Sequence, residues 1–312
     1  MAKVKHKEVA DYIEPLNMNG LKGRMLRVPA PTGKKREILF VYGHHSSLER
    51  WWGVIQDLNQ YGAVTMPDLP GFGGMDSFYK IGQKPSIDAM ADYLATFIKL
   101  RYKHKKISVS GLSFGFVIAT RMLQRYPDLV DKVDMFISVV GFSHHEDFAF
   151  SRRRYWFYRI LAAFFSYRIP AFFFKNIALN PLVLRVAYHK TNNAKIKFAN
   201  TDKTNHKAQM DFEIHLWHCN DVRTYMYTAN QFLKVDNCNK QINLPLWHVS
   251  VKDEQYFNHY LVLQHLKVIF KKVTVVVSSM DSHAPSIIAD VKAAAPLLPT
   301  KLRRVLARNI KT

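Results

Sequence analysis

Apolar segments of strand length alternate with segments of helical periodicity through the first half of the chain. Strand patterns fall at 37–43, 62–74 (where the strand runs into a Pro- and Gly-rich loop), 105–113 and 133–142, and helical patterns fall at 48–60, 86–101 and 114–128. Short apolar strands separated by helices are typical of a parallel sheet that is covered by helices. We therefore expect an α/β fold with a mostly parallel sheet.

This alternation is interrupted in the middle of the chain. Residues 143–235 are helical in pattern and rich in aromatic residues, with no clear strand. Strand and helix patterns then resume at 242–251, 256–268 and 271–279. The sequence predicts one sheet domain formed by 1–142 and 236–312, with 143–235 as a helical insertion.

The motif with the most chemical information is Gly111-Leu112-Ser113-Phe114-Gly115, between a predicted strand and a predicted helix. It matches the G-x-S-x-G nucleophile elbow. We expect Ser113 to adopt a strained turn with positive φ, which raises its hydroxyl above the sheet. Gly111 and Gly115 remove side chains that would collide across the turn. A plain Gly-rich turn is the alternative, and the strand–turn–helix context favours the catalytic interpretation.

Three motifs in order make the chain resemble the α/β-hydrolase family, in its serine esterase and lipase-like form with a helical cap insertion. They are VYGHHSSLERWW as the oxyanion loop, MPDLPGFGGMD as the loop after the next strand, and GLSFG as the nucleophile elbow. Two residues depart from the family pattern. Tyr42 stands where histidine is common, and Phe116 stands where a small residue often follows the elbow.

The resemblance implies a catalytic triad in the order nucleophile, acid, histidine. Asp253 follows the predicted strand 242–251, and His283 follows the last predicted strand. Asp253 would orient the His283 imidazole, and His283 would take the Ser113 proton and return it to the leaving group.

Other carboxylates compete for the role of the acid. Asp147 follows the strand 133–142 and is an alternative acid position in parts of the family. Glu254 and Asp281 lie next to the favoured residues, but we expect the first to project differently and the second to be a loop carboxylate. Asp68 is expected to be structural.

The resemblance also implies an oxyanion hole made by two backbone N–H groups. One belongs to Phe114, directly after the nucleophile, and the other belongs to His44. Such donors stabilise the transition state of acyl transfer by roughly 3–4 kcal/mol.

Positive charge is concentrated in the insertion. The chain has 45 Lys and Arg against 24 Asp and Glu, a net charge of +21. Residues 61–150, which hold the elbow, have a net charge of only +1, whereas 151–210 contain 12 Lys and Arg, 12 aromatic residues and one acid, Asp202. Under the resemblance this segment forms a cap, and its aromatic residues are expected to line an apolar acyl pocket.

Two interpretations of that basic, aromatic segment stay open. Its aromatic residues could pack onto the core beneath a solvated basic face, or 151–210 could contact an anionic membrane peripherally. A nucleic-acid partner is disfavoured because no recognised binding module is present. The N-terminus has no secretory signal and no segment has the length and apolarity of a spanning helix, so we expect a cytoplasmic protein, peripheral to the membrane at most.

We expect neither a cofactor nor a metal. The pairs His44-His45 and His144-His145 lack the spacing of metal ligands, and Cys219 and Cys238 are expected to be reduced, partly buried thiols. The predicted function is hydrolysis of carboxylic esters, with lipid-like esters as candidates. Thioester cleavage, acyl transfer and C–C hydrolysis use the same triad, whereas relatives with an Asp nucleophile are disfavoured by Ser113. The alternative is a catalytically silent scaffold that binds an anionic membrane or another polyanion.

Overall fold

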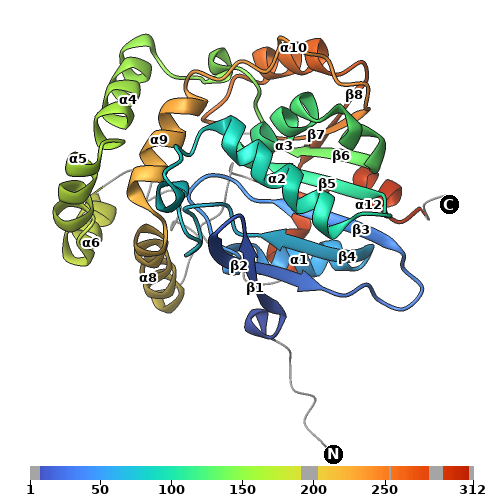
Figure 1. Cartoon of the computed structure of the whole chain (residues 1–312), viewed down its shortest axis with the longest axis horizontal. Coiled ribbons are helices and arrows are strands. Elements are labelled where there is room, and N and C mark those ends of the chain that lie inside the picture. The colour runs from blue at the N-terminus through green and yellow to red at the C-terminus, as the bar shows by residue number, and fades with distance from the viewer. Residues whose placement is uncertain (1–7, 191–202, 253, 281–290, 309–312) are drawn as a thin grey trace, which may run out of the picture.

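A mostly parallel sheet forms the centre of the molecule (Figure 1). The computed structural model describes residues 8–190, 203–252, 254–280 and 291–308. The strand order is β1-β2-β4-β3-β5-β6-β7-β8. The strands are β1 (Ile13–Met18), β2 (Leu21–Val28), β3 (Arg36–Val41), β4 (Gly62–Pro67), β5 (Ile107–Leu112), β6 (Val133–Val139), β7 (Leu246–Val251) and β8 (Val273–Ser278). Pairing is parallel from β4 to β8 across the sheet, and only β1 and β2 are antiparallel. The predicted α/β fold is confirmed.

The antiparallel β1–β2 hairpin was not predicted. Met18 pairs with Leu21, so Asn19 and Gly20 alone form the turn, and both have positive φ, of 53° and 78°. An Asn-Gly pair with this geometry is the strongest short-range signal for a hairpin. The sequence of β1 does not read as a strand because it contains Pro15. Proline is tolerated there because β1 is an edge strand of the sheet.

Helices connect the parallel strands and cover the sheet. They are α1 (Trp52–Asn59), α2 (Ile87–Arg101), α3 (Phe114–Arg125), α10 (His259–Ile269), α11 (Val291–Ala294) and α12 (Thr300–Leu306). Ser86 is the N-cap of α2, since its Oγ accepts a hydrogen bond from Ala89 N–H. In Figure 1, α2 and α3 lie side by side in front of the sheet. Helix α1 packs against α11.

The strand order reverses direction at β3. The chain passes from β3 to its neighbour β4, and then returns past β3 to β5. Right-handed crossovers put α1 and α2 on opposite faces of the sheet, so a crevice opens beyond the carboxyl ends of β3 and β5. His44 follows the first of these strand ends, and Ser113 follows the second.

Between β6 and β7 the chain forms a helical layer, here called the insertion, which comprises the described residues 152–232. Its elements are α4 (Arg152–Phe165), α5 (Arg168–Phe173), the π-helix η6 (Phe174–Ala178), α6 (Pro181–Lys190), α8 (Lys203–Cys219) and α9 (Val222–Phe232). A small core of its own includes Leu179, Leu184, Ile214 and Met226. Figure 1 shows α9 between α4 and the sheet domain, with α4, α5 and α6 outermost.

Candidate active site

Ser113 occupies the tip of the turn that joins β5 to α3. Its φ is 47° and its ψ is −115°, so the predicted positive φ is confirmed. The strained turn is stabilised by two backbone hydrogen bonds, from Ser113 N–H to Val139 O (2.9 Å) and from Phe116 N–H to Ser113 O (3.0 Å). Strain of this kind survives only where the surrounding structure fixes it, and it is concentrated at functional sites.

The two elbow glycines are required by close backbone contacts. A Cβ at Gly111 would lie 2.6 Å from Phe116 Cα, and a Cβ at Gly115 would lie 2.3 Å from Val41 O. Phe116, the larger residue after the elbow, is fully buried and stacks on Phe136 with ring centroids 5.3 Å apart. It is accommodated because Gly141 leaves space, since a Cβ there would lie 2.5 Å from Phe116 Cδ1.

A pocket of about 480 Å³ lies over Ser113. Residues of the sheet domain and of the insertion both line it. From the sheet domain come the loop residues Gly43, His44, His45, Arg50 and Trp51, the elbow residues Leu112, Ser113 and Phe114, and the aromatic residues Phe142, Phe148, Phe150, Tyr256 and Phe257. From the insertion come Arg154, Tyr158, Leu161, Ala162, Trp217, Tyr225, Met226, Ala229 and Phe232, and Leu233 directly after it also lines the pocket. Its size suits a small molecule, and its walls are mostly apolar.

The prediction of which aromatic residues line the pocket was partly wrong. Trp156, Phe157, Phe164, Phe172 and Phe173 do not line it and are exposed. On α4 the helical period places residues 158, 161 and 162 on the face toward the pocket, and residues 156, 157, 160 and 164 on the opposite face. The second expectation for these aromatic residues, that they pack onto the core, is also wrong for these five.

The His44 side chain joins the loop after β3 to the insertion. Its Nε2 lies 2.9 Å from Thr228 Oγ1 and 3.2 Å from the carbonyl oxygen of Tyr225. Because a carbonyl only accepts hydrogen bonds, Nε2 carries the hydrogen. The ring packs edge-on against Phe114 and Phe232, with centroids 5.4 Å and 5.0 Å away. Burial lowers the pKa of His44 to about 3, so the imidazole is neutral at physiological pH.

The two residues predicted to form the oxyanion hole border the same pocket. His44 and Phe114 both line the pocket beside Ser113. Phe114 is the first residue of α3, so its N–H has no helical acceptor. Within the described part of the chain, no protein acceptor takes a hydrogen bond from the backbone N–H of either residue. An oxyanion hole requires N–H donors without other acceptors, so the role of these two groups stays a prediction.

One side of the pocket is polar, and no motif in the sequence predicts it. Glu213 of α8 is fully buried, and its carboxylate lies 3.8 Å from Arg50 Nη2 and 4.0 Å from His45 Nε2. Arg50 Nη1 also donates to His45 O at 3.1 Å. The Glu213 carboxylate therefore offsets part of the positive charge that Arg50 brings to the pocket wall.

The predicted acid and base of the triad, Asp253 and His283, lie outside the described residues, and so does Asp281. The alternative acid Asp147 is fully buried. Its Oδ2 accepts hydrogen bonds from Ser143 N–H and His144 N–H, and its Oδ1 lies 2.6 Å from His265 Nδ1. Both oxygens of Asp147 are thus occupied by groups other than the predicted base.

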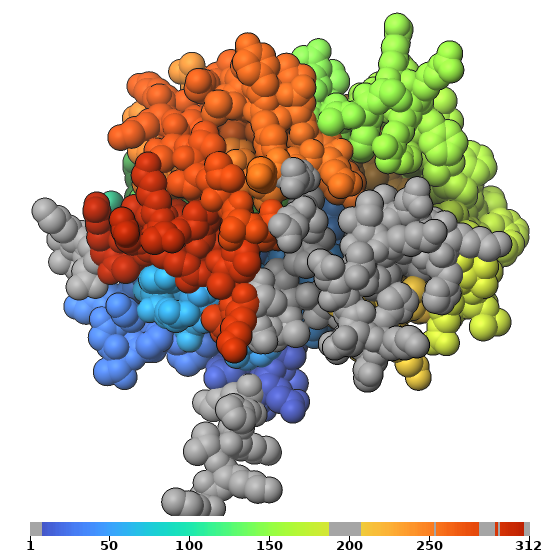
Figure 2. Space-filling view, turned by 180° about the vertical axis from the view of Figure 1, so that it is seen from behind, coloured from blue at the N-terminus to red at the C-terminus, as the bar shows by residue number. Residues whose placement is uncertain are grey.

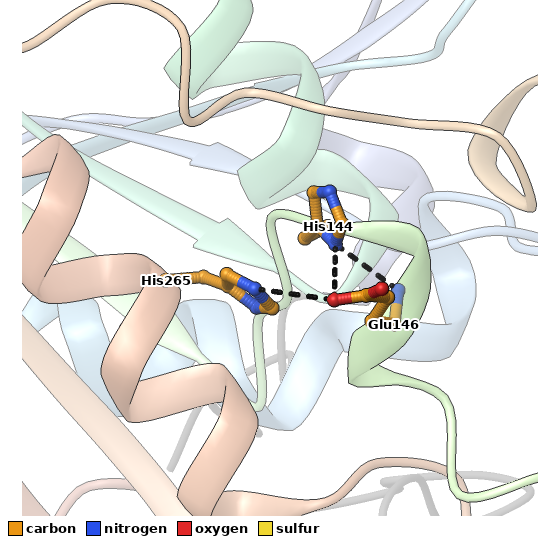
Figure 3. Close-up of side chains that lie close together, drawn as sticks. All are labelled: His144, Glu146 and His265. Atoms are coloured by element: carbon orange, nitrogen blue, oxygen red, sulfur yellow. Dashed lines mark hydrogen bonds and ion pairs between the residues drawn. The ribbon is translucent and has the colours of Figure 1, made fainter.

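Three side chains beside Asp147 form a cluster of metal-ligand type, which sequence reasoning missed because His265 is remote in the chain. His144 and Glu146 from the turn after β6 converge with His265 of α10 (Figure 3). Glu146 Oε2 lies 3.7 Å from His144 Nδ1 and 3.9 Å from His265 Nε2. Asp147 orients His265 through its other nitrogen, as outer carboxylates do at metal sites. However, His144 Nδ1 already accepts a hydrogen bond from Glu146 N–H at 3.2 Å, and a metal would have to displace it.

Neither cysteine has the character of a nucleophile. Cys219 and Cys238 are free and half-buried, as predicted. Burial raises the pKa of Cys219 to about 11 and that of Cys238 to about 12. Both therefore remain thiols at physiological pH, and the thiolate is the reactive form.

The chain belongs to the α/β-hydrolase fold family, whose model matches residues 38–290. Structures of esterases and an epoxide hydrolase are similar. An esterase from Thermogutta terrifontis has a TM-score of 0.62 and 15% identity, covering 95% of this chain and 98% of its own. An epoxide hydrolase from Bacillus megaterium has a TM-score of 0.63 and 13% identity, and the match covers 94% of this chain and 98% of the epoxide hydrolase. An esterase from Exiguobacterium antarcticum has a TM-score of 0.62 and 13% identity, and the match covers 85% of this chain and 90% of the esterase. A search of curated protein sequences found no significant match.

Proposed function

We propose that the protein is a serine hydrolase that cleaves carboxylic esters. The observation that carries this proposal is the position of Ser113. It lies on a turn with φ of 47° at the base of a mostly apolar pocket of about 480 Å³, next to the two candidate oxyanion donors. A strained serine at a helix N-terminus is suited to attack a carbonyl carbon, because the helix stabilises the negative charge that develops.

In the proposed reaction, Ser113 Oγ attacks the ester carbonyl while His283 takes its proton. The N–H groups of His44 and Phe114 stabilise the oxyanion. The alcohol leaves with the proton from His283, which forms an acyl-enzyme on Ser113. Water then attacks the acyl group, with His283 as base, and releases the acid. Asp253 orients His283 throughout.

The aromatic lining of the pocket supports an apolar acyl group as the substrate. Phe142, Phe148 and Phe257 from the sheet domain line the same pocket as Trp217 and Phe232 from the insertion. Burying each methylene of an acyl chain against such walls contributes about 0.8 kcal/mol. We expect kcat/KM to rise with acyl length until the pocket is filled.

A panel of p-nitrophenyl esters of increasing acyl length tests this proposal. Wild-type protein should hydrolyse them, and Ser113→Ala and His283→Ala should each lower kcat by at least about a thousandfold. Turnover that is equal in wild type and Ser113→Ala would overturn the proposal. No turnover in wild type, together with membrane binding, would favour the second candidate, a silent scaffold. The specific observation behind that candidate is the exposed apolar surface of the insertion.

A further inference from the structure

Large apolar side chains are concentrated on the outer helices of the insertion. In the described part of the chain, 19 large apolar residues are exposed, and 12 of them lie between residues 156 and 186. A monomeric protein seldom leaves an apolar patch of this density in water, and such patches mark sites of interaction. Something other than water is therefore expected to cover this surface.

Helix α4 carries apolar side chains on both its inward and its outward face. Its inward face, with Leu161 and Ala162, lines the pocket. Its outward face carries Trp156, Phe157 and Ile160, whose exposed fractions are 47%, 57% and 66%. A helix that is apolar on both faces is typical of a protein core or of a lipid environment. No described segment buries the outward face of α4.

The neighbouring helices extend the same surface. Ile169 and Phe172 of α5 are 71% and 63% exposed, and Leu182 and Val186 of α6 are 73% and 55% exposed. Figure 1 shows α4, α5 and α6 as one outer layer, and Figure 2 shows this layer from behind, in yellow-green, along one edge of the molecule. We call the outward surface of residues 152–186 the outer face.

The outer face is also cationic. Residues 152–186 contain seven Lys and Arg and no Asp or Glu. Arg185 of this segment pairs with Asp211 at 2.9 Å, whereas the exposed Arg152, Arg153, Arg168 and Lys175 have no carboxylate within ion-pair distance among the described residues. By contrast, the exposed Arg125 of the sheet domain contacts two aspartates. The unpaired charge of the outer face is thus available to an anionic partner.

We propose that the outer face docks on an anionic lipid bilayer, with its apolar side chains in the interfacial region and its cations at the headgroups. Apolar and aromatic side chains flanked by arginines are typical of interfacial helices. None of the described helices combines the length and apolarity needed to cross a membrane. Nucleic acid explains the charge but leaves the apolar side chains in water, and a second copy of the chain would bring together two cationic faces.

The pocket gives this docking a consequence for the substrate. Since α4 separates the outer face from the pocket, docking holds the pocket about one helix diameter, roughly 10 Å, from the lipid. The bilayer would then supply a lipid-derived ester as the substrate class. This last step rests on the proposed function, whereas the docking itself does not.

Co-sedimentation with vesicles tests the docking without any ester hydrolysis. The full chain, as wild type and as Ser113→Ala, is mixed with vesicles of phosphatidylcholine alone or with about 30% phosphatidylglycerol added, which gives the vesicles a negative surface potential. Both proteins should bind the anionic vesicles and bind neutral vesicles at least about tenfold more weakly. No binding to anionic vesicles would overturn the docking proposal and leave the hydrolase proposal untouched.

Surface variants with matched controls locate the contact. Phe157→Ser/Ile160→Ser should weaken vesicle binding by at least about tenfold, because two apolar side chains that enter the bilayer interface on docking are lost. Leu100→Ser/Tyr260→Ser removes two side chains of similar exposure elsewhere and should leave binding unchanged. Arg152→Gln/Arg153→Gln should weaken binding to anionic vesicles about fivefold for each charge removed. The control Lys103→Gln/Lys106→Gln, in the sheet domain, should leave this binding unchanged.

Two results would contradict the docking proposal. Equal weakening by test and control variants would show that the binding is non-specific. A dimer in light scattering that Phe157→Ser/Ile160→Ser dissociates, with vesicle binding unchanged, would assign the outer face to a second copy of the chain.

Discussion

The Tyr42 hydroxyl donates a hydrogen bond of 2.9 Å to Asp68 Oδ1 and accepts one of 2.7 Å from Leu69 N–H. Tyr42 follows β3 and begins the loop that contains His44, while Asp68 follows β4. Arg24 Nε holds the other Asp68 oxygen at 3.1 Å. The residue that departs from the family pattern thus fixes two loops at the carboxyl edge of the sheet. Asp68 has the structural role that was predicted for it.

Tyr42→Phe should destabilise the protein by about 1–3 kcal/mol, because it leaves a buried carboxylate oxygen and a buried N–H without their partner. Chemical denaturation measures this cost. Tyr260→Phe, at a side chain that is 69% exposed, serves as the control and should change stability by less than about 0.5 kcal/mol. Equal stability of Tyr42→Phe and wild type would show that the pair does not fix the loops.

The contact between His44 and Thr228 predicts a local effect. Thr228→Val keeps the side-chain shape but removes the oxygen that His44 Nε2 contacts, so α9 should exchange its amide hydrogens about threefold to tenfold faster. Thr96→Val is a matched control. Thr96 Oγ1 bonds to the carbonyl four residues earlier, as Thr228 Oγ1 does, but within α2. Hydrogen exchange at 222–232 that responds equally to both variants would show that His44 does not hold α9.

The sequence was sufficient for the parts of the site that depend on local structure. The strand, the two glycines and the helix around Ser113 are contiguous, so their geometry could be predicted before the fold was known. The lining of the pocket could not. Helical periodicity shows that Leu161 and Phe157 lie on different faces of α4, but only tertiary packing decides which face meets the pocket. The approach of His265 to Glu146 is likewise set by how α10 packs on the sheet.

Buried histidine makes stability depend on pH. His248 of β7 lies 2.9 Å from Ser138 Oγ, and burial lowers its pKa to about 4. Below its ordinary pKa of about 6.5, the unfolded chain gains a proton that the folded protein excludes. The contribution of His248 to the free energy of unfolding should therefore be largest above pH 6.5 and fall by about 1.4 kcal/mol per pH unit on acidification toward pH 4.

Denaturant titrations from pH 7.5 to 4.5 of wild type and His248→Gln measure this contribution. The variant is expected to be less stable at neutral pH. On acidification its free energy of unfolding should fall less steeply, by about 1.4 kcal/mol per pH unit, which corresponds to one proton. His44, whose pKa is lowered to about 3, should keep part of the slope in both proteins. If wild type and His248→Gln show the same slope of unfolding free energy against pH, folding does not lower the pKa of His248.

The pocket wall on α4 predicts a change in acyl specificity. Ala162 is buried and lines the pocket, so Ala162→Leu should narrow it and lower kcat/KM for long acyl chains at least about tenfold more than for acetyl esters. Ala163→Leu, one residue along the same helix and outside the lining, should leave the ratio unchanged. A uniform loss across all chain lengths in Ala162→Leu would place the acyl group elsewhere.

The central claim is that Ser113 is a nucleophile activated by its elbow. Intact-protein mass spectrometry after incubation with a fluorophosphonate tests it most directly. The predicted result is a single phosphonyl adduct on wild type that maps to Ser113, is absent in Ser113→Ala, and forms much more slowly in His283→Ala. No adduct on folded wild-type protein, or the same adduct on Ser113→Ala, would contradict the account.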